Sequence, residues 1–163
     1  MSQIEMLLKE FEKEAVTTKK MLALIPEDQY DWKPHAKSGS LIWLSKHLAE
    51  LPAWVKMALI TNEHDFQKNP YTLPDIKNNG ELLAFFDSNF EKSKQELLQA
   101  NDDQLKDMWT LRSGEIIHNH STKAEVIRMS YCQTVHHRAQ LGVYLRLLDI
   151  PIPGSYGPSA DEH

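Results

Sequence analysis

Hydrophobic residues recur at three- and four-residue steps in four long segments of the chain, which is the pattern of amphipathic helices. These segments are residues 2–25, 40–61, 79–100 and 122–148. Pro26 ends the first segment, and Pro52 lies inside the second, where it predicts a kink. Ser40 is a suitable N-cap for the second helix. Thr122 and Glu125 have the spacing of a capping box for the fourth.

Four helices of about 20 residues, without alternating strands, predict an all-α protein with a four-helix bundle. The segment between the second and third helices, residues 62–78, contains Pro70 and Pro74. Its length predicts a long crossover between these helices. Residues 101–120 lack helical periodicity, and they fit a short hairpin or an irregular flap. A chain of 163 residues fits one compact domain over residues 1–163.

Two of the predicted helices carry polar residues inside their apolar stripes. In the second helix His47 lies among leucines. In the fourth, the stripe has a polar centre of Ser130, Gln133 and His137 between its apolar ends. Burying a polar group without a partner is costly. The pattern therefore predicts one shared site between the second and fourth helices.

The residue types at this site are those that bind a divalent metal. Gln133 and His137 are four residues apart, so both reach the same point beside one helix face. With His47 they would supply two imidazoles and an amide, which suits zinc or nickel and leaves positions open for a substrate. Glu50 follows His47 by three residues and is expected to orient the imidazole or a water. His136 points about 100° away from His137 and is expected beside the site or on the surface.

Three interpretations of this pattern stay open. The first is a metal-dependent enzyme. The second is a non-catalytic binding protein with a degenerate metal site, which the amide of Gln133 favours. The third is a structural, dimer-forming bundle in which His47 is a core histidine bonded to a backbone carbonyl. The polar centre of the fourth helix argues against this last interpretation, because a core that serves packing alone gains from apolar residues.

Charge and cysteine content narrow the possible partners and the location. The net charge is −5, from 18 basic and 23 acidic residues that are interspersed along the chain. Without a basic stripe, neither nucleic acid nor an anionic membrane is an expected partner. The single cysteine, Cys132, excludes an internal disulfide framework, and the first residues lack the pattern of a signal peptide. We therefore expect a cytoplasmic protein.

Three stretches resemble a known family. They are Tyr-Asp-Trp-Lys-Pro-His at 30–35, His-Leu-Ala-Glu at 47–50, and His-His-Arg-Ala-Gln-Leu-Gly-Val-Tyr-Leu-Arg at 136–146, the last followed by Pro-Gly-Ser-Tyr-Gly-Pro at 153–158. Together they resemble the DinB/YfiT-like superfamily of small metal-binding four-helix bundles. The resemblance implies a metal site of three histidines, one on the second helix and two spaced by four on the fourth. His47 and His137 match two of these positions, and Gln133 departs from the third.

The resemblance also implies what the protein binds. Many members form homodimers, some are thiol-dependent transferases or isomerases, and others were named for induction by DNA damage. We therefore expect a small-molecule substrate, with a low-molecular-weight thiol as a candidate co-substrate, and a homodimer. Arg138 and Tyr144, which belong to the fourth-helix motif, are candidates to contact an anionic substrate group.

Overall fold

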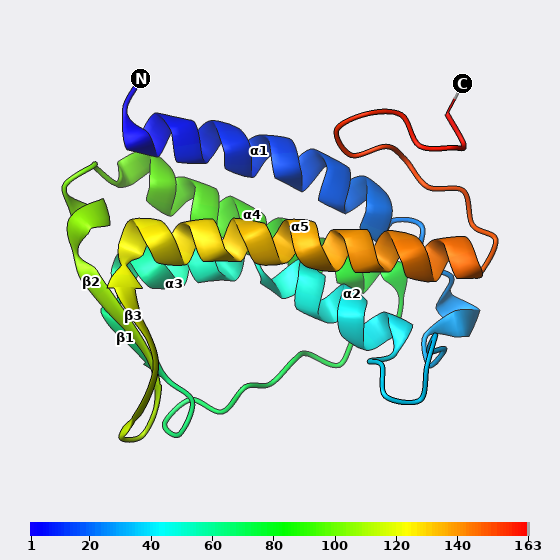
Figure 1. Ribbon diagram of the computed structural model, residues 1–163, viewed down its shortest axis with the longest axis horizontal. Helices are drawn as coiled ribbons and strands as arrows, with labels where there is room; N and C mark the ends of the chain where they lie inside the picture. The colour runs from blue at the N-terminus through cyan, green and yellow to red at the C-terminus, as the bar shows by residue number, and fades with distance from the viewer. Residues whose placement is uncertain (163) are drawn as a thin grey trace.

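The computed structural model describes residues 1–162, and five α-helices and a small sheet make up most of it (Figure 1). The helices are α1 (Gln3–Leu22), α2 (Leu41–Glu50), α3 (Ala53–Ile60), α4 (Asn79–Gln99) and α5 (Lys123–Leu147). Short 3-10 turns, η1 (Glu27–Gln29) and η2 (Gln104–Lys106), precede α2 and β2. The predicted caps are confirmed, since the Ser40 hydroxyl accepts from the Trp43 amide and Thr122 forms a capping box with Glu125.

The second predicted helix is divided into α2 and α3 at Pro52, as the sequence indicates. Proline lacks an amide hydrogen, so carbonyl groups near the break lose their helical partners. The Leu51 and Pro52 carbonyls accept instead from the Trp54 and Val55 amides at 3.1 and 3.2 Å, and side chains of neighbouring helices add a second donor to each. Ser130 of α5 donates to the Leu51 carbonyl at 2.8 Å, and Ser93 of α4 donates to the Pro52 carbonyl at 2.7 Å. The break is thus stabilised from two sides of the bundle.

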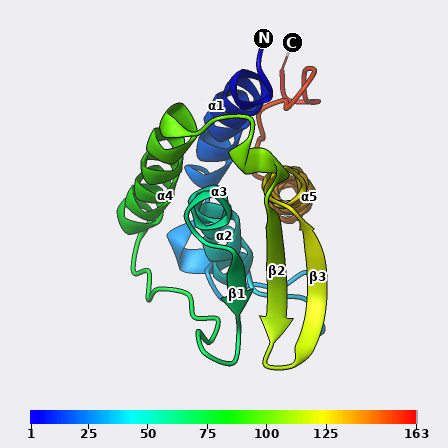
Figure 2. The same ribbon diagram turned by 90° about the vertical axis from the view of Figure 1, so that its left-hand side faces the viewer.

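The α2–α3 pair acts as one arm of a four-cornered bundle. Both α1 and this arm pack against α4 and α5, so the arm lies opposite α1 (Figure 2). In Figure 1, α1 and α5 run in one direction along the bundle, and α2–α3 and α4 run in the other. The connection 61–78 is long, but it joins neighbouring helices. The predicted long crossover between the second and third helices is therefore not confirmed.

A three-stranded sheet, only partly predicted, lies at one end of the bundle. Strands β2 (Met108–Ser113) and β3 (Ile116–Thr122) form an antiparallel hairpin, as residues 101–120 suggested. Strand β1 (Glu63–Asp65) pairs with β2 in parallel, which the sequence did not indicate. Asp65 links the two parts, because its buried carboxylate accepts the Gly114 amide of the hairpin turn at 2.9 Å.

The apolar core forms two clusters along the bundle. The first includes Leu22, Leu48 and Leu141, and the second includes Phe11, Val55 and Trp109. In the part of the chain that the structure describes, no helix combines the length and the apolar character that a membrane crossing needs.

Candidate functional site

Two histidines from separate helices meet at the surface between α2 and α5. The ring centroids of His47 and His137 are 4.6 Å apart, and the rings stand nearly perpendicular, at 80°. Both side chains are partly buried, because each lies at the margin of its helix's apolar face. The prediction that these imidazoles converge is confirmed in its geometry.

The position of His47 is set by the ring of Trp43 and by the hydroxyl of Tyr71. Trp43, one turn earlier in α2, stacks on its ring with centroids 5.5 Å apart and planes inclined by 18°. Gly39 makes room for this tryptophan, since a Cβ at position 39 would lie 2.5 Å from its ring. The Tyr71 hydroxyl is 2.9 Å from His47 Nδ1 and donates to Glu50 at 2.7 Å. Because that hydroxyl proton goes to Glu50, the Tyr71 oxygen accepts the Nδ1 proton of His47.

His137 has a matching arrangement on α5. The amide oxygen of Gln140 lies 2.8 Å from His137 Nδ1, and an amide oxygen can only accept, so Nδ1 carries the proton. In the neutral form of either histidine, the other nitrogen, Nε2, therefore presents a lone pair. Partial burial lowers the pKa of His137, and the nearby His47 and His136 lower it further, against the Gln140 hydrogen bond, which raises it. The lowered pKa favours the neutral, ligand-competent form of the ring.

The structure places the other predicted site residues as follows. Glu50 approaches His47 as expected, with a carboxylate oxygen 3.5 Å from Nδ1. His136 is exposed, and its ring centroid lies 4.9 Å from that of His137. Gln133 is exposed one turn before His137, and its side chain makes no hydrogen bond within residues 1–162. Over the same residues, no three His, Cys, Asp or Glu side chains gather as a metal site.

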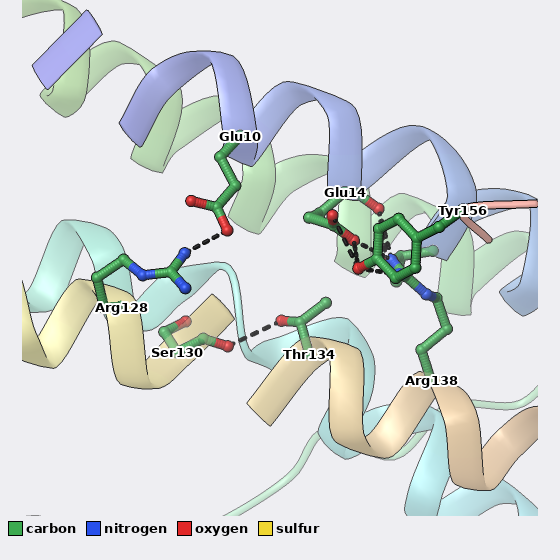
Figure 3. Close-up of polar contacts among 8 residues, drawn as sticks. Glu10, Glu14, Arg128, Ser130, Thr134, Arg138 and Tyr156 are labelled. Carbon is green, nitrogen blue, oxygen red and sulfur yellow. Dashed lines mark hydrogen bonds and ion pairs between the residues drawn. The ribbon is translucent and has the colours of Figure 1, made fainter. Parts of the chain in front are cut away.

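Arg138 is not at this site. Its guanidinium is buried against α1, where it pairs with the Glu14 carboxylate at 2.6 Å and donates to Thr18 at 3.1 Å (Figure 3). The Tyr156 hydroxyl completes the cluster by accepting from Arg138 and donating to Glu14. The prediction that Arg138 contacts a substrate anion beside the histidines is therefore wrong, because an α1 carboxylate already occupies it.

Tyr144 and Ser130 also have structural partners. The Tyr144 hydroxyl donates to the Gly39 carbonyl, and its ring packs edge-on against Trp32. Tyr144 thus stabilises the loop after α1 and does not line an open site. Ser130, predicted as part of the polar centre, bonds the carbonyl of Leu51 at the helix break. The predicted stripe of α5 is only partly correct: Ser130 is buried, but His137 lies at the margin of the buried face, Gln133 lies outside it, and Thr134 and Arg138 are buried instead.

Two residues that contact the histidines were not predicted from the sequence. Gln140 follows His137 by three residues, the same spacing as Glu50 after His47, so this repeat could have identified it. Tyr71 gave no signal, because it belongs to a connection without periodicity, and only folding brings it to α2.

Comparisons with known proteins agree with this architecture. The bundle is similar to a DinB-like protein from Bacillus cereus (TM-score 0.73, 17% identity, covering 96% of this chain and 100% of that one). It is also similar to the DinB-like YjoA of Bacillus subtilis (TM-score 0.71, 19% identity, covering 92% and 96%).

A third similar structure is YfiT from Bacillus subtilis (TM-score 0.68, 14% identity, covering 91% and 89%). YfiT is described as a probable metal-dependent hydrolase with an unusual four-helix bundle topology. No curated protein sequence matches the chain. The family model of the DinB family matches residues 1–163. The chain therefore belongs to the DinB family.

Proposed function

We propose that this protein is a metal-dependent enzyme whose divalent ion is held between α2 and α5 by Nε2 of His47 and Nε2 of His137. The amide oxygen of Gln133 would complete the protein ligands. The observation that carries the proposal is that the two imidazoles have the same tautomer and lie side by side. They converge from separate helices, and each Nδ1 proton has an acceptor, Tyr71 or Gln140. Histidine ligands of metals commonly have such a partner on the second nitrogen.

The donor set fits a metal of intermediate softness. Two imidazoles and an amide contain no carboxylate, so zinc or nickel suits them better than magnesium or calcium. Replacing the family's third imidazole with the amide of Gln133 predicts weaker binding. A divalent ion in such a site lowers the pKa of a bound water or thiol and polarises a substrate oxygen.

The surrounding residues keep the ligands oriented. Tyr71 and Gln140 hold the Nδ1 protons, Trp43 fixes the plane of the His47 ring, and Glu50 anchors Tyr71. Two nucleophiles are compatible with this arrangement. Water would give hydrolysis, the activity suggested for YfiT, and a low-molecular-weight thiol would give group transfer.

The test is metal binding by purified protein prepared without chelators. We expect about one equivalent of zinc or nickel in the wild type by elemental analysis, and its loss in His137→Ala and His47→Ala. His35→Ala is the matched control, because His35 is exposed in the loop after α1. Equal metal content in all four proteins would exclude the assigned ligands.

A second candidate function is a non-catalytic binding protein whose metal site has degenerated. The exposed, unpartnered amide of Gln133 favours it. The variant Gln133→His separates the two candidates. A wild type without metal, together with a variant that binds metal tightly, would support the binding protein, whereas metal in both proteins would support the enzyme.

A further inference from the structure

A cavity of about 230 Å³ adjoins the candidate metal site. It lies between α3 and the connection that leads to α4, and Glu50 and Tyr71 belong both to its wall and to the hydrogen-bond network of His47. Its volume is below the range of about 300–1,000 Å³ typical for drug-sized ligands. A small molecule, or one end of a larger one, would fill it.

Four of the ten residues that line the cavity carry aromatic rings, and these rings are inclined to one another. Trp54 and His64 have ring centroids 6.1 Å apart with planes at 53°, and His64 and Phe66 have centroids 4.8 Å apart at 81°. Tyr71 and Met57 add a further ring and a thioether to the wall. Rings at such angles enclose a hollow instead of stacking on each other. Their faces carry partial negative charge, which attracts cations.

The charged residue in the cavity wall is also negative. Glu50 is its acidic residue, and no lysine or arginine lines it. The nearby Lys56 is turned away, because it pairs with Glu96 of α4 at 3.0 Å. Tyr71 donates to Glu50 Oε2, whereas Glu50 Oε1 makes no hydrogen bond to any residue from 1 to 162. One carboxylate oxygen therefore stays available to a ligand.

We propose that this cavity binds the ammonium group of a small cationic substrate, with Glu50 as counter-charge and the rings of Trp54, Phe66 and Tyr71 as walls. The inference rests on the proposed function in one respect: the shared residues Glu50 and Tyr71 would place the substrate beside the metal ligands. A neutral apolar ligand fits less well, because it would desolvate the carboxylate without replacing its water.

Choline and its neutral isostere 3,3-dimethylbutan-1-ol test the proposal, since they differ in charge but hardly in shape. Binding is measured by calorimetry at constant ionic strength on protein dialysed against chelator, so the result does not depend on metal. We expect choline to bind at least about tenfold more tightly than the alcohol, as a desolvated cation–π contact together with a carboxylate provides.

Two variants assign the effect. Glu50→Gln retains an acceptor for Tyr71 and removes the charge, so it should lower choline affinity to that of the alcohol. Phe66→Leu keeps an apolar side chain without the ring and should weaken choline binding several-fold. Glu91→Gln, an exposed carboxylate on α4, is the control and should bind choline as the wild type does.

The proposal is overturned if the alcohol binds as tightly as choline, if neither binds, or if Glu50→Gln binds choline unchanged. Metal titrations on the same preparations keep the two proposals separate. Choline binding without metal binding would leave the cation cavity standing and remove the enzyme proposal. The reverse result would remove the cavity alone.

Discussion

The tautomer of each histidine at the candidate site is decided by a single neighbouring atom. For His47 this atom is the hydroxyl oxygen of Tyr71, and for His137 it is the amide oxygen of Gln140. An imidazole with Nδ1 protonated presents its lone pair on Nε2. The readiness of both rings to bind metal therefore depends on residues that would not contact the ion.

Tyr71→Phe tests this dependence. The ring remains, but the Nδ1 proton of His47 loses its closest acceptor, so we expect metal affinity to fall about 10–100-fold. Competition against a chromogenic chelator measures the affinity. Since Tyr71 is partly exposed, the melting temperature should change little. Unchanged affinity would show that Glu50, at 3.5 Å, orients His47 without the tyrosine.

At the scale of elements, the break between α2 and α3 sets the angle of the arm that carries His47. The break leaves carbonyl groups in the bundle interior, and Ser93 and Ser130 satisfy two of them. Ser93 also accepts the Lys56 amide at 3.2 Å, so it bonds both to the break at Pro52 and to the first turns of α3. These hydroxyls are structural, although their position in the core resembles that of a polar site.

Ser130→Ala measures this contribution. Removing the hydroxyl takes one of two donors from the buried Leu51 carbonyl, which keeps the Trp54 amide at 3.1 Å, so we expect a loss of about 0.5–1.5 kcal/mol of unfolding free energy. Urea denaturation gives the value, with the exposed Ser88→Ala of α4 as control. If Ser130 served the metal site, the variant would instead bind metal more weakly and keep the stability of the wild type.

The junction of β1 with the hairpin depends on an ionised side chain. Amide hydrogen bonds from Gly114 and Gln67 lower the pKa of Asp65, outweighing its burial, and Lys68 and Arg112 act in the same direction. The folded pKa thus lies below the unfolded value of about 3.9. The stabilisation is complete above the unfolded pKa and is lost as pH falls through the folded pKa.

Asp65→Asn should therefore be less stable than the wild type at pH 7, and the difference should shrink below about pH 4. Denaturant titrations across this pH range provide the measurement. Asp103→Asn, an exposed carboxylate after α4, is the control. A difference between Asp65→Asn and the wild type that did not vary with pH would show that the charge of Asp65 is unimportant.

At the scale of the whole molecule, a buried ion pair joins both ends of the chain. Glu14 of α1 and Arg138 of α5 are buried together, and Tyr156 of the C-terminal segment bonds to both (Figure 3). An unpaired charge in this place would be costly. The pair therefore makes the docking of α1, α5 and the tail interdependent.

Glu14→Gln should destabilise the fold by about 3–5 kcal/mol, because it leaves the guanidinium buried without a counter-charge. The double variant Glu14→Leu with Arg138→Met removes both charges and should lie closer to the wild type. Thermal or urea unfolding compares the wild type, Glu14→Gln, the double variant and its two single variants, Glu14→Leu and Arg138→Met. Additive losses in a double-mutant cycle would show that the two side chains act independently.

Much of the architecture follows from local signals. The helical spans, the caps at Ser40 and Thr122 and the division at Pro52 depend on residues close in sequence, so the sequence predicts them. The first helix is shorter than expected and ends at Leu22, three residues before the predicted Ile25. The convergence of His47 and His137 was also predictable, because each interrupts an apolar stripe.

By itself, the sequence determined where the helices form, where one of them breaks, and which two histidines face each other. The tertiary structure decided what the other polar residues do: Ser130 satisfies a distant carbonyl, Arg138 pairs with α1, and Tyr71 arrives from the long connection. Periodicity shows that a polar group is near the core. Only the packed chain shows which partner compensates it, because those partners lie up to 124 residues away.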